Sequence, residues 1–225
     1  MIVFDQVSVI RDQQVIVDNV SVHLGEHRIG IIGDNGSGKS TFIRLINGLA
    51  IPEQGRVTVD DFDTAKDRNQ VRRRVGFVFQ NPDNQIVYPI VREDLAFGLK
   101  NLRLPQPEID RKINEYACRY RLEPLLDRQS HNLSGGEKQL LALAGVLIME
   151  PAYLVLDEPT TLLDLRNKKA VMDTVMALSQ TVIMVSHDLD FLHGFDRILQ
   201  FANGRIVADG PPAEVIPRYI EQSLC

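Results

Sequence analysis

Residues 33–41 carry the clearest chemistry in the chain, because they fit the GxxxxGK[ST] pattern of a phosphate-binding P-loop. Glycines let successive backbone N–H groups converge on one point without a Cβ atom in the way. A helix that starts near Ser40 adds its positive end, and Lys39 adds a mobile charge for the β- and γ-phosphates. The Ser40 hydroxyl suits a magnesium ion. The predicted nucleotide-binding residues of the loop are Gly33, Asp34, Asn35, Gly36, Ser37, Gly38, Lys39, Ser40 and Thr41.

A glycine-rich turn in an unrelated α/β protein is the alternative interpretation of this loop. The apolar residues 29–32 predict a buried strand before the loop, and the pattern of residues 40–49 predicts a helix after it. This strand–loop–helix context favours the P-loop. We therefore predict that the chain binds a nucleoside triphosphate.

Two acidic residues, Asp157 and Glu158, directly follow the apolar and aromatic residues 153–156. A strand buried on both faces can end in carboxylates only where something compensates their charge. Beside a P-loop, that partner is the magnesium ion at the phosphates, so we predict that Asp157 is a metal ligand, acting through water. Glu158 is predicted to orient, or take a proton from, the water that attacks the γ-phosphate. A strand end that simply reaches solvent is the alternative.

Residues 133–137 read LSGGE and open a further predicted helix. Ser134 and Glu137 form an S-x-x-E capping box, which alone indicates only a helix start. The box does not explain Gly135 and Gly136, since a glycine inside a helix costs about 0.8–1.0 kcal/mol relative to alanine. Bare N–H groups at a helix N-terminus predict a second anion site. Because the P-loop already holds the nucleotide, we predict that two chains share each nucleotide.

The elements that must position these residues alternate between strands and helices. This alternation predicts a mostly parallel sheet covered on both faces, with an antiparallel pair near the N-terminus and a helical insertion that Pro105 and Pro107 break. Predicted strands cover residues 2–9, 15–24, 29–32, 55–59, 75–79, 153–156, 181–186, 197–201 and 205–208, and predicted helices cover residues 40–49, most of 92–149, about 166–178 and the C-terminal end.

Composition limits the possible functions. The chain has 225 residues, enough for one domain with a smaller subdomain, and its net charge of −5 gives no sign of a nucleic-acid partner. Its longest apolar run, residues 140–149, is far shorter than the roughly 20 residues of a membrane helix, and its start does not resemble a signal peptide. If the protein functions at a membrane, we therefore expect it to do so by binding another protein chain. Cys118 and Cys225 are expected to be plain thiols in a reducing compartment.

On these motifs the sequence resembles the ATPase subunits of ABC transporters along nearly its whole length, and LSGGE is similar to that family's signature. The resemblance implies an α/β P-loop NTPase fold with a RecA-like core, a mostly parallel sheet, an antiparallel β edge and an inserted helical subdomain. The core would comprise residues 1–80 and 150–225, and the subdomain residues 81–149, approximately. The implied cofactors are ATP and Mg²⁺.

The resemblance also assigns roles to three residues outside these motifs. Gln80, after the strand at residues 75–79, is similar to the family's Q-loop glutamine, which senses the metal and the attacking water. His187 is similar to the switch histidine at the γ-phosphate, and Asp164 to the D-loop aspartate at the dimer interface. Each has a plainer alternative: a turn residue, a structural histidine and a helix cap. The implied catalytic set is Glu158, His187, Gln80 and Lys39, and the implied metal ligands are Ser40, Gln80 and Asp157.

Two positions depart from the family pattern. Arg11 lies where an aromatic residue usually stacks on adenine, and a guanidinium can stack on a base with roughly 0.5–2 kcal/mol. We therefore include Arg11 among the nucleotide-binding residues, together with Ser134, Gly135, Gly136, Glu137 and Asp164. Leu162 replaces a glycine that is common in the D-loop, which predicts altered packing at the dimer interface.

Residues 79–85, FQNPDNQ, and residues 93–99, EDLAFGL, resemble the energy-coupling-factor (ECF) importers and their cobalt and nickel relatives. The resemblance implies an ATPase that energises uptake of a vitamin, with biotin as first choice, or of cobalt or nickel. It implies a peripheral location on the cytoplasmic face of the cell membrane. The implied partners are a second ABC ATPase in a homodimer or heterodimer, an integral membrane coupling protein (T component) and a substrate-binding membrane protein (S component), without nucleic acid.

Two other classes of function compete with a transporter subunit. A soluble ABC ATPase of translation or DNA repair usually carries two nucleotide modules or a long coiled-coil arm, and this chain shows one module and an ordinary helical insertion. A non-hydrolysing binding module would be expected to have a damaged site, whereas Lys39, Asp157, Glu158 and His187 are all present. The sequence therefore favours an active ATPase.

Overall fold

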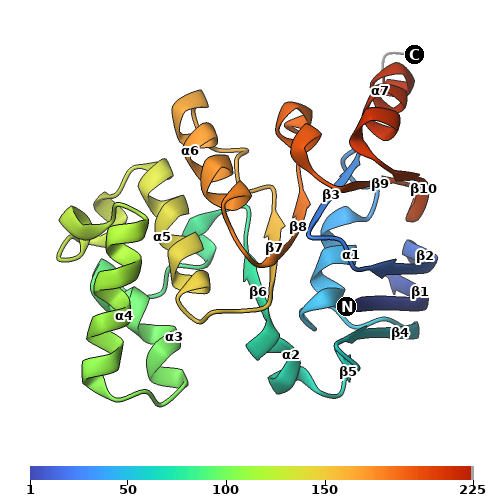
Figure 1. Ribbon diagram of the computed structural model, residues 1–225. Coiled ribbons are helices and arrows are strands. Elements are labelled where there is room, and N and C mark those ends of the chain that lie inside the picture. Colours follow the sequence, from blue (N-terminus) through green and yellow to red (C-terminus); the bar gives the residue numbers. More distant parts are fainter. Residues whose placement is uncertain (224–225) are drawn as a thin grey trace. The chain divides into compact units, whose positions relative to one another are not determined.

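The computed structural model describes residues 1–223, which group into two compact units (Figure 1). The first unit comprises residues 1–76, 152–158 and the described residues from 179 onward, and the second comprises residues 77–151 and 159–178. The second unit is thus larger than the predicted helical subdomain, because residues 159–178 group with it. Cys225 lies outside the described residues, and Cys118 is an exposed free thiol.

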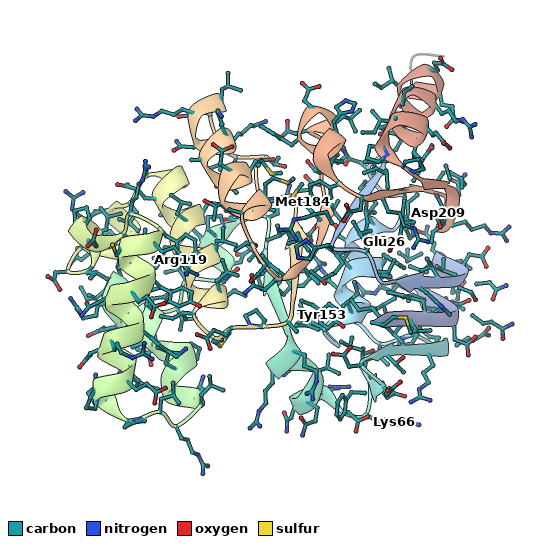
Figure 2. All side chains as sticks on the ribbon, viewed as in Figure 1. Glu26, Lys66, Arg119, Tyr153, Met184 and Asp209 are labelled. Atoms are coloured by element: carbon teal, nitrogen blue, oxygen red, sulfur yellow. The ribbon has the colours of Figure 1, made fainter. Side chains whose placement is uncertain are left out.

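The first unit contains the predicted, mostly parallel sheet. Its strands lie in the order β10-β9-β3-β8-β7, and the neighbouring pairs from β9 to β7 are parallel. Strands β3, β7, β8 and β9 are mostly buried, and Met184 of β8, labelled in Figure 2, is fully buried, whereas β10 alternates between exposed and half-buried residues. A further strand, β6, carries the chain out of this unit. The bounds are β3 (Arg28–Gly33), β6 (Val75–Val78), β7 (Tyr153–Asp157), β8 (Thr181–Val185), β9 (Arg197–Ala202) and β10 (Arg205–Gly210).

A second sheet in the same unit is antiparallel. The predicted pair is present as β1 (Ile2–Arg11) and β2 (Gln14–Leu24), joined by a tight turn whose two residues, Asp12 and Gln13, have φ values of 47° and 65°. The sheet continues with β4 (Gln54–Val59), which pairs with β1, and the short β5 (Phe62–Asp63). The fold class predicted from the sequence, a P-loop core with an antiparallel β edge, is confirmed.

Helix α1 (Lys39–Ile46) connects the two sheets of the first unit. Its Phe42 stacks on Phe4 of β1 with ring centroids 4.2 Å apart, and it lies 4.7 Å from Phe201 of β9. All three rings are fully or almost fully buried, and burying a phenylalanine side chain contributes about 1.5–3 kcal/mol. This core fixes the start of α1 against both sheets. The other helices of the unit are α2 (Arg68–Arg74) and α7 (Pro212–Ser223).

The second unit is built from helices, as predicted for residues 92–149. The break between the first two helices falls before Pro105, while Pro107 lies in the first turn of the next helix, where its missing N–H is tolerated. Gly98 allows close packing, because a Cβ there would lie 2.6 Å from the sulfur of Met149. The helices are α3 (Val91–Asn101), α4 (Gln106–Arg119), α5 (Gly135–Leu147) and α6 (Leu165–Met176).

Candidate functional site

The P-loop joins the end of β3 to the start of α1 in the first unit. Gly33 and Gly38 have φ values of 141° and 104°, which side chains rarely adopt. A Cβ atom at Gly33 would lie 2.2 Å from the carbonyl oxygen of Phe201, and one at Gly38 would lie 2.4 Å from that of Ile16. Strands β9 and β2 therefore hold the loop from two sides, which leaves no room for residues other than glycine at these two positions.

Lys39 is buried within this loop. Its Nζ donates hydrogen bonds of 2.7 Å to the carbonyl oxygens of Gly33 and Asp34. Burial lowers the pKa of Lys39, while Glu158, Asp34 and Asp157 act in the opposite direction. The hydroxyl of Ser37 is also buried, and it has no hydrogen-bond partner among the described residues. A buried cation and an unsatisfied donor in one glycine-rich loop are suited to a polyanion such as a triphosphate.

Asp157 lies at the end of β7, beside the start of α1. Its Oδ1 accepts a hydrogen bond from the Ser40 hydroxyl at 3.0 Å, and its Oδ2 lies 3.2 Å from an Arg44 guanidinium nitrogen. Burial raises the pKa of Asp157, although the bond from Ser40 and the charge of Arg44 oppose the rise. The pairing brings together a hydroxyl and a buried carboxylate, the hard oxygen donors that Mg²⁺ prefers. These two residues therefore fit the predicted metal.

Arg44 is not among the site residues predicted from the sequence. The signal was present, because Arg44 follows Ser40 by four residues on one helix, and residues at that spacing share a face.

Glu158 and His187 lie together at the ends of neighbouring parallel strands. Glu158 follows β7 and has a φ of 49°, a left-handed conformation that costs roughly 1–2 kcal/mol for a residue with a Cβ. Its backbone N–H donates to the carbonyl oxygen of Val185 at 3.0 Å, and its Oε1 lies 3.2 Å from Nε2 of His187. The backbone thus turns Glu158 away from the direction of the strand, and its carboxylate is oriented by the histidine.

Tyr219 contributes a contact to the P-loop that the sequence did not reveal. Its hydroxyl, on helix α7, donates to Oδ1 of Asp34 at 3.1 Å. Arg11, in contrast, ends β1, pairs with Gln14 across the hairpin and has an exposed side chain. The structure therefore connects the C-terminal helix to the loop and leaves Arg11 at the tip of the β1–β2 hairpin.

The LSGGE residues begin helix α5 in the second unit. The capping box is complete: the backbone N–H of Ser134 donates to Glu137 Oε2 at 2.7 Å, and the Ser134 hydroxyl accepts from the backbone N–H of Glu137 at 3.4 Å. The hydrogen bonds from Ser134, led by its hydroxyl, lower the pKa of Glu137.

The two glycines of LSGGE have different surroundings. A Cβ at Gly136 would lie 2.4 Å from Cγ of Asn167 on α6, whereas a Cβ at Gly135 would meet nothing closer than 3.9 Å. Asn167 in turn is held by Asp164, which accepts its backbone N–H at 2.8 Å and its side-chain N–H at 3.1 Å as the N-cap of α6. Close packing against Asn167 in the same chain therefore requires glycine at position 136, independently of the predicted anion site.

The FQNPDNQ segment makes structural contacts inside the second unit. The side chain of Gln85 donates to the carbonyl oxygen of Ala142 at 2.7 Å and accepts the N–H of Phe79 at 3.2 Å. Asp83 lies 2.7 Å from the ammonium of Lys138 on α5. Gln80, two residues after the end of β6, has an exposed side chain. These contacts tie the segment to helix α5, which begins with LSGGE.

Comparison with known proteins identifies the family. The profile of the ABC transporter family matches residues 17–161, which include the P-loop, LSGGE, Asp157 and Glu158. The chain belongs to the ABC transporter family. As a member of this family it is an ATP-binding and ATP-hydrolysing subunit, which confirms the predicted enzymatic class.

Similar ABC proteins cover nearly the whole chain. A putative ABC transporter ATP-binding protein of Deinococcus radiodurans is 55% identical, covering 94% of this chain and 93% of its own length. The biotin transport ATP-binding protein BioM of Rhizobium etli is 46% identical, covering 97% of both chains. These similarities confirm the resemblance to ABC ATPases of the biotin importer type.

Two solved structures share the ABC ATPase fold. The structure of CbiO1 from Clostridium perfringens, part of the ABC transporter complex CbiONQ, is 31% identical with a TM-score of 0.86, covering 99% of this chain and 93% of that chain. The ATP-binding cassette MJ0796, a dimer in a post-hydrolysis state with ADP and Pi, is 25% identical with a TM-score of 0.84, covering 94% and 99%.

No helix within residues 1–223 of this ABC ATPase is both long enough and apolar enough to cross a membrane. In the same range, no group of three or more histidine, cysteine or acidic residues is arranged to hold a metal ion.

Proposed function

We propose that this ABC ATPase energises an ECF-type importer, with biotin as the first candidate substrate and cobalt or nickel as the alternative. The observation that supports ATP hydrolysis best is the pairing of Glu158 with His187, 3.2 Å apart, beside a P-loop with a buried lysine. The ECF assignment is supported by the FQNPDNQ segment and by the similarity to BioM and CbiO1. The known roles that name these relatives favour transport over translation or DNA repair.

The residues of the first unit divide the work of ATP hydrolysis. Lys39 releases its two carbonyl partners and binds the β- and γ-phosphates, because a phosphate is a stronger partner for an ammonium than a neutral carbonyl. Glu158 accepts a proton from the attacking water or orients it. His187 holds the Glu158 carboxylate in place and contacts the γ-phosphate. Glu158 is well placed for this role, since its backbone conformation directs it away from Asp157.

Ser40 and Asp157 would hold Mg²⁺, with Gln80 as the further ligand that the family resemblance implies. When bound, the ion neutralises charge on the phosphates. Before that, the buried Asp157 carboxylate is compensated by Arg44 and Ser40. Arg44 is therefore a positioning residue, which keeps Asp157 ionised and oriented at the end of β7.

We further propose that two chains share each nucleotide, the P-loop of one facing LSGGE of the other. Support comes from the exposed start of α5, where Ser134 and Gly135 are exposed. A Cβ at Gly135 would meet nothing closer than 3.9 Å, and the residue is exposed, so its backbone N–H can be approached by an anion. Exposed Leu162 and Leu165, beside the proposed D-loop aspartate Asp164, supply apolar surface for a second copy or a related ATPase. The dimeric MJ0796 cassette is consistent with this arrangement.

The membrane partner is proposed to bind near residues 81–99. In this segment Val87, Tyr88 and Phe97 are exposed, and the rings of Tyr88 and Phe97 lie 5.5 Å apart. Asp94 fixes the segment by accepting the backbone N–H groups of Val87 and Tyr88 at 2.8 and 3.0 Å. An exposed apolar patch on a fixed backbone suits a cytoplasmic helix of the T component. The ATPase would thereby be held at the cytoplasmic face of the membrane.

The variant Glu158→Gln tests the hydrolytic assignment. It preserves shape but removes the base, so we expect ATP binding and nucleotide-dependent dimerisation to persist while turnover falls at least about 100-fold. Turnover by phosphate release, nucleotide binding by equilibrium dialysis and mass by light scattering would be measured together. Near-normal turnover would remove Glu158 from its proposed role, and a monomer at saturating ATP, even with its membrane partner, would refute the shared nucleotide site.

Co-purification tests the transporter assignment. The chain, carrying an affinity tag in its native host, is expected to bring down an integral membrane coupling protein and a small substrate-binding membrane protein. Radiolabelled biotin and cobalt uptake by cells lacking the chain would then separate the two candidate substrates. Co-purification with RNA or ribosomal proteins in place of membrane proteins would contradict the assignment.

A further inference from the structure

A concentrated positive patch lies around helix α2 in the first unit. Residues 66–74 contain five basic residues and one acidic residue, in a chain whose net charge is −5. Four of the basic side chains are exposed, and that of Arg74 is half-buried. We call this group the basic patch, and it consists of Lys66, Arg68, Arg72, Arg73 and Arg74.

The charge of the basic patch exceeds that of the acids around it, although Lys66 and Arg74 lie close enough to act on the carboxylates of Asp63 and Asp60. None of its five side chains forms an ion pair with another residue of the described range 1–223. Of the nearby acids, Asp63 pairs with Arg56 at 3.1 Å, while Asp67 accepts the backbone N–H of Asp63 at 3.0 Å and is the one acid within residues 66–74 to offset the five cations. Since unpaired cations on a folded surface attract anions, the patch is available to an anionic partner.

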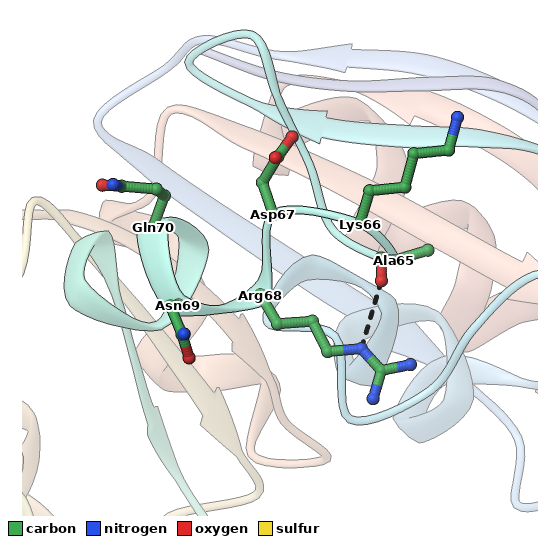
Figure 3. Close-up of a pocket in the computed structure, with 6 residues that line it drawn as sticks. All are labelled: Ala65, Lys66, Asp67, Arg68, Asn69 and Gln70. Carbon is green, nitrogen blue, oxygen red and sulfur yellow. Dashed lines mark hydrogen bonds between the residues drawn. The ribbon is translucent and has the colours of Figure 1, made fainter.

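The shape of the patch favours an extended partner over a single bound phosphate. Residues 65–70 line an open hollow, where Lys66 and Arg68 point in different directions (Figure 3). Arg68 is fixed by a hydrogen bond of 3.2 Å from its Nε to the carbonyl oxygen of Ala65. Val71 is the one residue of α2 with a buried side chain. The side chains of Arg72 and Arg73, which follow it, are exposed to solvent. Because these side chains point in different directions, they cannot converge on one phosphate, but they can each meet a separate negative charge on an extended surface.

Apolar side chains lie next to the basic patch. Gly48 lies against Arg68, because a Cβ on Gly48 would be 3.7 Å from Cγ of Arg68. Directly after it, Leu49 and Ile51 are 45% and 44% exposed. Basic residues beside exposed large aliphatic residues are typical of protein surfaces that lie on a lipid bilayer, where the cations meet headgroups and the apolar groups enter the interface.

We propose that the basic patch, with Leu49 and Ile51, binds the anionic headgroup surface of a phospholipid membrane. The inference rests on the proposed location at the cytoplasmic face, and it adds a direct lipid contact to the one made through the membrane partner. An acidic protein segment is the other possible partner for these cations. The lipid surface is favoured because the cations diverge and the neighbouring side chains are aliphatic. A single lysine or arginine near an anionic membrane strengthens binding about five-fold.

Vesicle binding of the purified full chain tests this proposal. The probes are vesicles of phosphatidylcholine alone and vesicles that also contain phosphatidylglycerol. We expect sedimentation with the anionic vesicles only, and release by salt, because surface charges are screened within about 10 Å at 0.1 M. The variant Arg72→Gln/Arg73→Gln is expected to bind about 30-fold more weakly. Lys100→Gln/Arg218→Gln removes the same charge from exposed positions elsewhere, and it should bind within about two-fold of the parent.

The outcomes separate this proposal from the proposed function. Absence of binding to anionic vesicles by the parent chain overturns the lipid contact, as does equal weakening by both double variants. Loss of co-purification with membrane proteins by Arg72→Gln/Arg73→Gln, without vesicle binding by the parent, would assign the patch to a protein partner. Thermal melting and ATP turnover of both variants should match the parent, because the substituted side chains lie outside the nucleotide site. A failure of ATP turnover or of transporter assembly concerns the proposed function instead.

Discussion

The two glycines of LSGGE should respond in opposite ways to substitution by alanine. A Cβ at Gly136 would lie 2.4 Å from Cγ of Asn167, closer than real Cβ contacts allow, whereas a Cβ at Gly135 would find only ordinary contacts at 3.9 Å. Gly136→Ala therefore requires Asn167 to move. This movement disturbs the two hydrogen bonds that Asn167 makes with Asp164, the N-cap of α6.

The sizes of these effects follow from the contacts. Overpacking costs about 1–3 kcal/mol, and a lost N-cap costs about 0.5–2 kcal/mol. Alanine recovers at most about 1 kcal/mol of helix propensity in either variant, less in a first turn. We expect Gly136→Ala to lower the free energy of unfolding by about 1–2 kcal/mol, and Gly135→Ala to leave it unchanged or raise it slightly. For a chain of this length, 1 kcal/mol shifts the melting temperature by about 2–4 °C.

Urea unfolding of the nucleotide-free chain measures the difference, and Asn167→Ala provides the control. In that background the clash disappears, so Gly136→Ala should lose most of its cost. ATP turnover completes the experiment: Gly135→Ala should reduce turnover in spite of its stability, because its bare backbone is proposed to face an anion. Equal stability of the two alanine variants would refute the packing explanation, and full turnover of Gly135→Ala would refute its proposed role.

Two more predictions concern contacts that were not evident from the sequence. Tyr219→Phe removes the hydrogen bond to Asp34 and leaves a freer carboxylate beside the phosphates, so KM for ATP should rise about two- to five-fold with kcat unchanged, and Asp34→Asn should abolish the effect. Burial raises the pKa of Asp94 above its usual 3.8, so the parent loses stability as pH rises through that raised value. In urea unfolding, the stability of Asp94→Asn relative to the parent should therefore increase as the pH rises above about 4; a difference that stays constant with pH would contradict the raised pKa.

Local patterns in the sequence were sufficient to predict the P-loop motif, the two acids after the strand at residues 153–156 and most of the strands and helices in their order. Glycine positions, apolar runs and caps act over a few residues, so they can be recognised without knowing the fold. Helix α2 was missed because Val71 is its only buried residue, and one apolar position shows no helical period. The pairing of β4 with β1 was also missed, since strand pairing depends on distant residues.

The predicted site was incomplete where contacts join distant parts of the chain. Tyr219 and Asp34 are 185 residues apart, and no motif connects them. The contact of Asn167 with Gly136 joins two helices whose packing is not evident from either helix alone. Arg44 is different, because its spacing from Ser40 placed it on the same helix face in the sequence itself.

The strand that leads into the P-loop has a consequence for biosynthesis. Strand β3 ends at Gly33, yet both of its neighbours, β8 and β9, begin only at Thr181 and Arg197. While the ribosome makes the intervening residues, the isoleucines of β3 have no sheet to enter, and such exposed apolar segments attract chaperones or other nascent chains. The nucleotide pocket is consequently among the last features to mature. ATP in the cell can therefore bind and stabilise the chain only when its synthesis is nearly complete.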